Sequence, residues 1–273
     1  MAARAIWTGS ISFGLVNVPV RLYSATQQKD IRFHEFDQKT GKRIRHKRIT
    51  EGSSREIDYE DVAKGYEVSK GKYVVLERDE LEAADPEKTR TIEISEFVEL
   101  AEIDPIFFEK SYYLGPEKDK GAKRAYALLF RALEEADMVA VARFVMRSKE
   151  YLAALRAGDG LLVLETMFFP NEIREPKSTV AGLPLNVKVE SRDLDMAKRL
   201  VRGLTAEWEP SKYKDRYRQR VLSLIKRKQE GKEIVAEPDE DREPPTDLMD
   251  ALRASVEEMK KKKKGSRSRR KAG

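Results

Sequence analysis

The 273-residue chain contains no cysteine and only two histidines. The absence of cysteine excludes disulfide bonds, thiolate metal sites and a cysteine nucleophile, and it is typical of proteins that work in a reducing cytoplasm. No apolar run approaches the roughly 18 residues that a membrane-spanning helix needs. The opening residues MAARAIWTGS hold no apolar stretch of signal-peptide length. We therefore expect a cytoplasmic globular protein.

Sequence signatures of enzymes are also scarce. HEFDQ begins like the zinc motif H-E-x-x-H, but Gln38 stands at the position of the second ligand, and GSISFG lacks the lysine of a phosphate-binding loop because Leu15 follows it. A Ser–His–acid triad and a carboxylate-metal nuclease stay open as alternatives. However, no nucleophile elbow marks the first, and surface ion pairs account for acids scattered among bases. We expect no enzymatic activity, no cofactor and no metal.

Charge is abundant and unevenly distributed. The net charge is +6, with 54 Lys and Arg against 48 Asp and Glu. Residues 260–273 carry +9 without an acid, and residues 234–259 carry −7, which leaves only +4 for residues 1–233. Such blocks are typical of interaction tails. The basic end is therefore either a solvated appendage or a contact for nucleic-acid phosphates.

The first two thirds of the chain predict mainly β-structure. In VNVPVRLYS, apolar residues alternate with others, and Ile11, Phe13 and Leu15 alternate before it. Pro19 lacks the amide hydrogen of a ladder and indicates an edge or a bulge. Further strands are predicted at KYVVLE, RTIEISEFVEL and MVAVARFVMRS, and a hairpin joins YLAALR to LLVLETMFF through AGDG. The predicted class is α+β, mainly β, with a barrel or sandwich and attached helices.

Three helices are predicted from apolar residues three and four positions apart. The first lies in GAKRAYALLFRALEEA, with an apolar face of Ala125, Leu128, Leu129, Ala132 and Leu133. The second lies in RDLDMAKRLVRGLTAEW behind Ser191 as the capping residue, and the third in DRYRQRVLSLIKRKQEG ends near Gly231.

The character of the sequence changes after residue 230. Residues 231–245 are acidic and rich in proline, which indicates a linker. Residues 246–259 return to helical spacing, with an apolar stripe of Leu248, Met249, Leu252 and Val256. A short isolated helix is only marginally stable in water, so this stripe predicts a docking segment for a partner or for the rest of the chain. Residues 260–273 form the basic tail, which we expect to be disordered when free.

Two basic clusters occur within the predicted β-region. KTGKRIRHKRI holds six cations, and if it is a strand, Arg43, Arg45, Lys47 and Ile49 share one face. VARFVMRSK places Arg143 on one strand face together with Arg147. Rows of this kind suit a track of phosphates, although an ordinary charged strand face explains either cluster equally well. No helix-turn-helix, zinc finger or RNA-recognition signature accompanies them.

Several longer stretches resemble the bacterial Ku proteins, the homodimeric DNA-end binders of non-homologous end joining. The resemblance runs through AIWTGSISFGLVNVPVRLYSAT, DYEDVAKGYEVSKGKYVVLERDEL, EIDPIFFEKSYYLGP, FVMRSKEYLAALR, FFPNEIR and LTAEWEPSKYKDRYRQRVLSLIKRK. It covers nearly all of residues 1–230, and together these motifs are specific. PTDLMDALRASVEE stands where family members place a segment that contacts their DNA ligase, and the lysine-rich end resembles the extended tail of some members.

The resemblance implies a Ku core over residues 1–230, with a β-barrel, a β-rich bridge and a helical arm. Two copies would form a ring around double-stranded DNA ends, and the partner would be the multifunctional ATP-dependent ligase, ligase D. In a bacterial cell this would place the protein at the nucleoid. DNA contacts are expected at Arg32, Arg43, Arg45, Lys47, Lys110, Arg143 and Arg147, and in the tail at Lys260, Lys261, Lys262, Lys263, Lys264, Arg267, Arg269, Arg270 and Lys271. Ligase docking is expected at Leu248, Met249, Leu252 and Val256.

One position departs from the family pattern. Many bacterial members have a C-x-x-C pair after the basic run, where this chain has Thr50 and Ser53. Neither side chain binds zinc as a thiolate does. The alternative to an end-binding ring is a general nucleic-acid chaperone or ribosome-associated protein that uses the same tail without any dependence on DNA ends.

Overall fold

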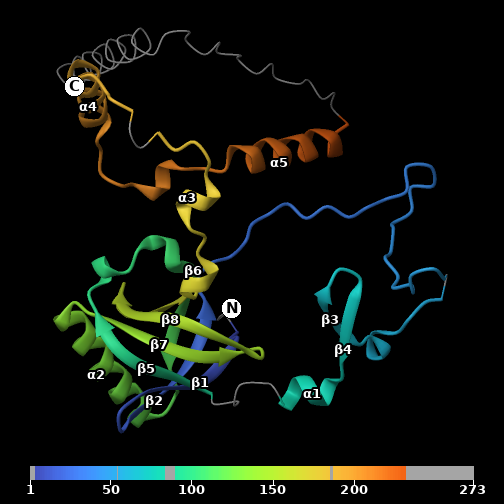
Figure 1. The fold of residues 1–273 in the computed structure, drawn as a ribbon, viewed down its shortest axis with the longest axis horizontal. Coiled ribbons are helices and arrows are strands. Elements are labelled where there is room, and N and C mark those ends of the chain that lie inside the picture. Colours follow the sequence, from blue (N-terminus) through green and yellow to red (C-terminus); the bar gives the residue numbers. More distant parts are fainter. Residues whose placement is uncertain (1–3, 54, 84–89, 185–186, 232–273) are drawn as a thin grey trace. The chain divides into compact units, whose positions relative to one another are not determined.

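A computed structural model describes residues 4–53, 55–83, 90–184 and 187–231. The chain divides into two compact units, residues 1–179 and residues 180–273. The first unit contains all the described strands, and the described part of the second contains helices only (Figure 1). The predicted acidic linker, the docking helix and the basic tail lie almost wholly outside the described residues.

Seven strands of the first unit close into a barrel in the order β1-β2-β6-β9-β8-β7-β5. Every neighbouring pair is antiparallel except β1 and β5, which run parallel and complete the closure. This confirms the mainly β class with a barrel core. The strands are β1 (Trp7–Phe13), β2 (Val16–Ser24), β5 (Thr91–Val98), β6 (Phe108–Pro116), β7 (Val139–Met146), β8 (Lys149–Gly158) and β9 (Leu161–Met167).

The alternation of side chains fills the barrel. Val18, Val20 and Leu22 of β2 are completely buried and contact the inward residues of the other strands. The prediction was wrong at two neighbouring positions. Val16 opens the strand and is 41% exposed, and Leu15 lies in the β1–β2 turn beside Gly14, whose φ of +57° suits a tight hairpin.

Pro19 does not mark an edge strand, because β2 pairs with β1 on one side and with β6 on the other. The β2–β6 ladder begins only at Val20, opposite Pro116. The carbonyl of Pro19 accepts a hydrogen bond from the amide of Glu117 at 3.1 Å, just beyond that ladder. Proline is tolerated here since the missing donor falls where the second ladder has ended.

Helix α2 (Lys120–Ala136) packs against β2, β6 and β8. Asp119 caps its start by accepting from the amide of Ala122 at 2.8 Å, and Asp137 ends it with a φ of +53°. Leu129 and Leu133 join the barrel core, as predicted. Leu128, however, is 70% exposed, and Ala132 is exposed as well, so these two predictions were wrong.

The predicted hairpin is confirmed, with β8 and β9 joined through Asp159 and Gly160, both at positive φ. A second hairpin of the first unit, β3 (Lys64–Ser69) with β4 (Lys72–Leu76), lies outside the barrel sheet. This unit also contains two short helices, α1 (Arg78–Ala83) and α3 (Pro176–Thr179). In the described parts of the chain, no helix is long and apolar enough to cross a membrane.

The second unit contains α4 (Ser191–Leu204) and α5 (Arg216–Gln229), as the apolar spacing predicted. The cap of α4 is Glu190 rather than Ser191, which is the first helical residue. Asp215 caps α5 by accepting from the amide of Arg218 at 2.8 Å. No described residue of this unit is buried, so its described apolar side chains form no core within the unit.

Candidate nucleic-acid interface

The first basic cluster is held between two tight turns. Asp37 begins the first turn, where its backbone bonds to Lys42 and Gly41 and its carboxylate accepts from the Thr40 hydroxyl at 2.5 Å. The second turn begins at Thr50, whose amide donates to the carbonyl of Arg55 at 3.1 Å. Gly41 and Gly52 adopt positive φ in these turns, a conformation that glycine accepts without steric cost.

Residues 43–49 do not form the predicted strand. Two isolated bridges, Phe36 with Arg43 and Ile49 with Glu56, pair only the ends of this segment. The two turns supply those partners, and no continuous neighbouring strand is present among the described residues. A shared strand face for Arg43, Arg45 and Lys47 is therefore not seen, although every residue from 41 to 50 is exposed.

The cations of this segment are neutralised to different degrees. Lys47 pairs with Glu56 at 2.6 Å, whereas the Arg43 guanidinium contacts Nδ1 of His34 at 2.9 Å and pairs with no carboxylate among the described residues. Arg45 and Arg32 make no ion pair with any described residue. Exposed and unneutralised guanidinium groups are the form in which arginine binds phosphate bidentately.

A second group of cations, which we call the rim cations, comprises Lys110, Arg147 and Lys149. All three are exposed. The Lys110 ammonium lies 5.5 Å from the ring centre of Tyr112, and that of Lys149 lies 5.0 Å from the ring centre of Tyr151. Burial raises the pKa of the Tyr112 hydroxyl, with Tyr151 and Glu109 adding to the rise, and the charge of Arg147 opposes it. The structure thus brings two predicted contact residues together around Tyr112.

The backbone at Arg147 is unusual. Strand β7 ends at Met146, so Arg147 lies in the two-residue turn to β8 and not on a strand face shared with Arg143. Arg147 and Ser148 have φ values of +56° and +61°, where a turn of this type normally carries asparagine and glycine. An arginine held in this conformation is costly, and such residues gather at functional sites.

Arg143 and Lys149 lie on neighbouring strands, β7 and β8. Arg143 is exposed on β7, opposite Glu93 of β5, and is apart from the rim cations in the strand register. Lys149 was not among the predicted contacts. The sequence could have indicated Lys149, because it ends the stretch VARFVMRSK two residues after Arg147. Its place beside the Tyr151 ring is known only from the structure.

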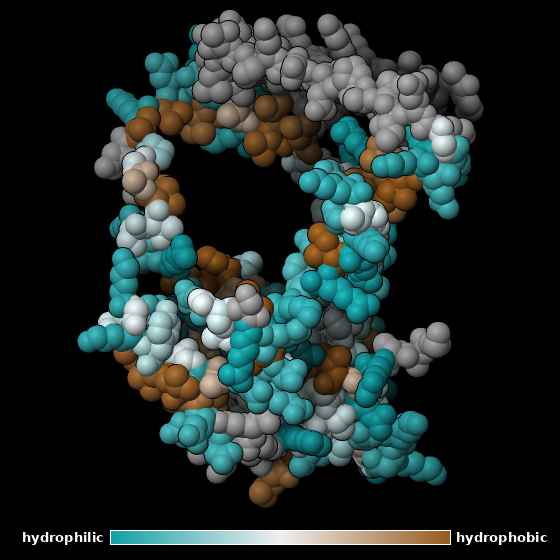
Figure 2. All heavy atoms as spheres, turned by 90° about the vertical axis from the view of Figure 1, so that its right-hand side faces the viewer, coloured by the Kyte–Doolittle hydropathy of each residue, from teal (hydrophilic) through white to brown (hydrophobic). Residues whose placement is uncertain are grey.

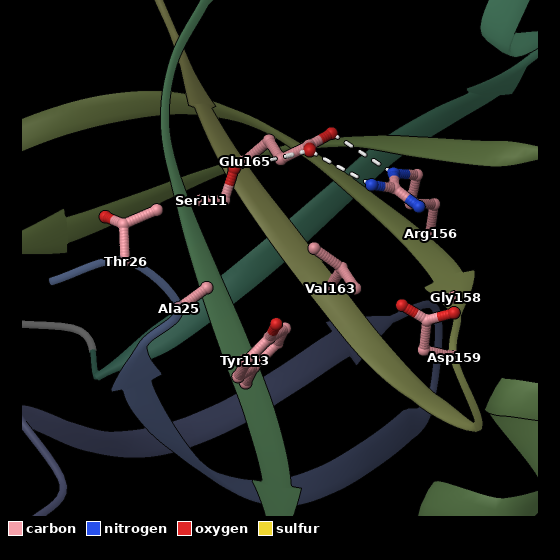
Figure 3. A pocket seen from close by; sticks show the side chains of 9 residues that line it. All are labelled: Ala25, Thr26, Ser111, Tyr113, Arg156, Gly158, Asp159, Val163 and Glu165. Atoms are coloured by element: carbon pink, nitrogen blue, oxygen red, sulfur yellow. Dashed lines mark hydrogen bonds and ion pairs between the residues drawn. The ribbon is translucent and has the colours of Figure 1, made fainter. Parts of the chain in front are cut away.

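The described residues also form a small cavity of about 280 Å³ on strands β6, β8 and β9, lined by Ala25, Thr26, Ser111, Tyr113, Arg156, Gly158, Asp159, Val163 and Glu165 (Figure 3). Arg156 and Glu165 point toward one another there and form two hydrogen bonds of 3.1 and 3.2 Å. Because Glu165 neutralises the guanidinium, the cavity offers no free charge to a ligand through this arginine.

The groups with perturbed pKa lie elsewhere. The hydrogen bond from Thr40 lowers the pKa of the Asp37 carboxyl. The Arg21 guanidinium donates two hydrogen bonds of 2.7 Å to Glu117, which lower the pKa of the Glu117 carboxyl and raise the pKa of Arg21. Burial raises the pKa of Tyr126, whose hydroxyl links the Leu114 carbonyl to the Leu162 amide. Turn geometry, ion pairing and burial explain all of these, and none of the groups lines the cavity.

The turn at Thr50 and Ser53 shows no metal-binding chemistry. The Ser53 amide donates to the Thr50 carbonyl at 3.1 Å, and the Ser53 hydroxyl accepts from the amide of Arg55 at 3.3 Å. Across the described residues, no cluster of three His, Cys, Asp or Glu side chains could hold a metal ion. Hydrogen bonds within the chain support this turn.

These features suit sequence-independent contact with a polyanion. The cations come from exposed turns and from a barrel end, and such groups position a phosphate backbone without reading base edges. The family model of the "Ku70/Ku80 beta-barrel domain" matches residues 12–196. The chain therefore belongs to the Ku family.

Curated relatives agree with this assignment. "Non-homologous end joining protein Ku" of Anaeromyxobacter sp. (strain K) is 50% identical over 235 residues, which are 86% of this chain and 78% of that protein. The protein of the same name from Heliobacterium modesticaldum is 40% identical, over 97% of this chain and 95% of its own length. That of Mycobacterium tuberculosis is 39% identical, over 94% and 96% respectively.

Proposed function

We propose that the chain is a scaffold that binds ends of double-stranded DNA independently of sequence and takes part in non-homologous end joining. Membership of the Ku family and the names of the relatives support this role. The observation that carries it is the pair of exposed cation groups, the basic segment 39–48 and the rim cations, neither of which lies on a helix in the described part of the chain. A protein that must accept any end needs phosphate contacts and gains nothing from base readout.

The active form is proposed to be a homodimer. The described helices of the second unit bury no residue, yet they expose large apolar side chains. Hydrophobic residues that are exposed on one face of the chain are brown in Figure 2. Trp208 and Tyr213 stack at 5.0 Å and are 75% and 71% exposed. A unit that orders about fifty residues without a core lacks the burial that offsets the lost conformational entropy, so a second copy of the chain is proposed to cover it.

The β3–β4 hairpin supports the same conclusion independently. Tyr66, Tyr73 and Val75 are each more than 60% exposed, and nearly every residue of the two strands is exposed. An isolated two-stranded hairpin is marginally stable in water at best. Its apolar side chains are therefore proposed to become covered in the assembled dimer.

A comparison of linear duplex with covalently closed circles tests the end-binding proposal. We expect the purified chain to shift linear DNA and to leave closed circles largely free, because only an encircling assembly needs an end to load. Equal binding to both forms would favour the alternative, a general nucleic-acid chaperone. Turnover of DNA by the purified chain would favour an enzyme instead.

Recruitment of the ATP-dependent DNA ligase D is proposed from the sequence of residues 246–259. Leu248→Asp with Leu252→Asp is expected to abolish stimulation of the ligase and to leave DNA-end binding intact. If the double variant unfolds the barrel, the segment belongs to the folded body and the docking proposal fails.

The basic tail is proposed to add phosphate contacts without any preference for ends. Truncation after Met259 is expected to flatten the dependence of affinity on salt, by roughly 0.9 in the logarithmic slope for each phosphate that the tail would have neutralised. End preference should stay the same or sharpen. Equal slopes for the two chains would mean that the tail is only a solvated appendage.

A further inference from the structure

Helix α5 carries a straight row of cations that lies outside both cation groups of the first unit. We propose that Arg216, Arg220 and Arg227, which we call the arginine row, form a separate binding site for the phosphate backbone of duplex DNA. The proposal rests on the proposed function in one respect, because it takes DNA as the polyanion. It concerns the second unit, which we call the helical unit because its described elements are helices. The proposed site is independent of the basic segment, of the rim cations and of the tail.

The spacing of the helix places the row on one line. At 3.6 residues per turn, Arg216, Arg220, Ser223 and Arg227 fall within about 60° of one another around the axis. With a rise of 1.5 Å per residue, the row is about 16 Å long. All four residues are exposed, and the three arginines make no ion pair with a described residue.

The opposite side of the same helix is apolar. Tyr217, Val221, Leu224 and Ile225 lie between about 80° and 180° from Arg216, and Tyr217 is 72% exposed. If a second copy covers this apolar side, the row of guanidinium groups faces away from that contact. The two functions of α5 therefore need not compete for the same surface.

The positive charges at the N-terminal end of α5 destabilise the helix. The helix contains six Lys and Arg and no acid, and three of these cations fall within its first five residues. Positive side chains near the N-terminus oppose the helix dipole, which favours anions there. Asp215 offsets part of this by capping the helix. Residues that break a local rule without a gain inside the chain are expected to act on something outside it.

Duplex DNA fits the row better than a peptide does. A duplex carries one charge for each 1.7 Å or so of its axis when both strands are counted, so its phosphates repeat densely and regularly along a row about 16 Å long, whatever the base sequence. A peptide must bring its carboxylates into register with the row. The acidic residues 234–259, which follow α5 in the sequence, could compete with DNA for the row. Crosslinking to them is one outcome of the second test below.

The first test is the salt dependence of binding to linear duplex by the full-length chain. Arg216→Gln with Arg220→Gln and Arg227→Gln is expected to reduce the slope of log affinity against log salt by about 2 to 3 for each chain. The control is Lys123→Gln with Arg124→Gln and Arg131→Gln, which removes the same charge from exposed positions of α2. A change of slope equal to that of the control overturns the proposal.

The second test uses the absence of cysteine from the chain. Ser223→Cys, in the middle of the row, gives a unique thiol for a benzophenone photocrosslinker, and Gln229→Cys places the same probe at an exposed position about 120° further around α5. We expect Ser223→Cys to crosslink to DNA far more efficiently than Gln229→Cys. Crosslinks from Ser223→Cys only to residues 234–259, or to a second copy, would overturn the proposal.

The two proposals fail in different ways. If the chain binds closed circles as well as linear DNA, the end-binding function fails, and the arginine row is still tested by the crosslink. If the chain prefers ends but the row variants behave as the α2 control does, the inference alone fails.

Discussion

The barrel and the helical unit use the same apolar residue types in opposite ways. In the barrel, side chains such as Leu155, Leu162 and Leu164 are completely buried, and α2 adds Leu129 and Leu133 to the same core. In the helical unit, Val201 and Leu204 lie on an amphipathic helix and are 67% and 66% exposed. An amphipathic pattern therefore specifies which side of an element is apolar, and not which surface will cover it.

The barrel and the helical unit therefore differ in whether folding or assembly would stabilise them. Burial of the barrel core takes place within one chain, so its contribution does not depend on concentration. The proposed burial of the helical unit needs a second chain and depends on concentration by mass action.

Replacement of the stacked aromatic pair should break the assembly and spare the barrel. Trp208→Ala with Tyr213→Ala is expected to weaken dimerisation about 1000-fold, because exposed aromatic anchors at interfaces each contribute about 2 kcal/mol or more. Sedimentation over a range of concentrations measures this change. The control is Leu128→Ala, an exposed apolar residue of α2, and an equal effect of both changes would contradict a specific aromatic anchor.

Truncation in the barrel core should have the converse effect. Leu155→Ala removes a fully buried side chain and is expected to lower the free energy of unfolding by about 3 kcal/mol. Urea unfolding of the barrel should show this loss at every protein concentration. Leu194→Ala in α4, where the leucine is 45% exposed, should cost the barrel nothing. A concentration-dependent loss for Leu155→Ala would mean that the barrel is itself stabilised by assembly.

The strained turn separates stability from DNA binding within the barrel unit. Arg147→Gly is expected to raise the free energy of unfolding by about 0.5–1 kcal/mol, since glycine adopts positive φ without steric cost. It should also weaken DNA binding and lower the salt slope by about 0.9. Asp159→Gly relieves a similar conformation, with φ of +49°, in the β8–β9 turn, and should raise stability without lowering the slope. A stabilised Arg147→Gly variant with unchanged DNA binding would remove Arg147 from the interface.

Lowering the pH should reduce the stability of the first unit slightly, because two of its carboxyl groups have lowered pKa values. The pKa values of Asp37 and Glu117 are lowered from 3.8 and 4.5 in the folded chain. Their contribution to stability is therefore complete above those usual values and is lost as the pH falls through the lowered ones. Glu117→Gln should reduce the loss of stability between about pH 5 and pH 3, measured as the thermal midpoint at each pH. An unchanged acid profile would mean that the pair with Arg21 contributes nothing.

Particular residues show where the sequence was sufficient for prediction. Val18, Val20 and Leu22 recur at every second position, and a period of two identifies an inward strand face. The hairpin at Asp159 and Gly160 has a local turn signal that needs no distant partner. The family motifs likewise lie in contiguous stretches, and they predicted the barrel fold that the comparisons confirm.

Other residues show where sequence reasoning failed. The apolar spacing of α2 is satisfied equally by Leu128 and Leu129, and only contact with the barrel decides that Leu129 is buried. A period of two continued through Arg147, although strand pairing ends β7 one residue earlier. The contact residues of the basic segment were predicted as a strand face, and the backbone forms two turns instead.

Residue identity and local spacing were enough to establish the charge blocks, the absence of thiol chemistry, the periodicity of strands and helices, and the family. Tertiary structure alone decided which apolar faces are buried, how β1 and β5 close the barrel, and that Lys110, Arg147 and Lys149 surround two tyrosines. These features join residues far apart in the chain, and the free energy of such contacts depends on partners that no local pattern specifies.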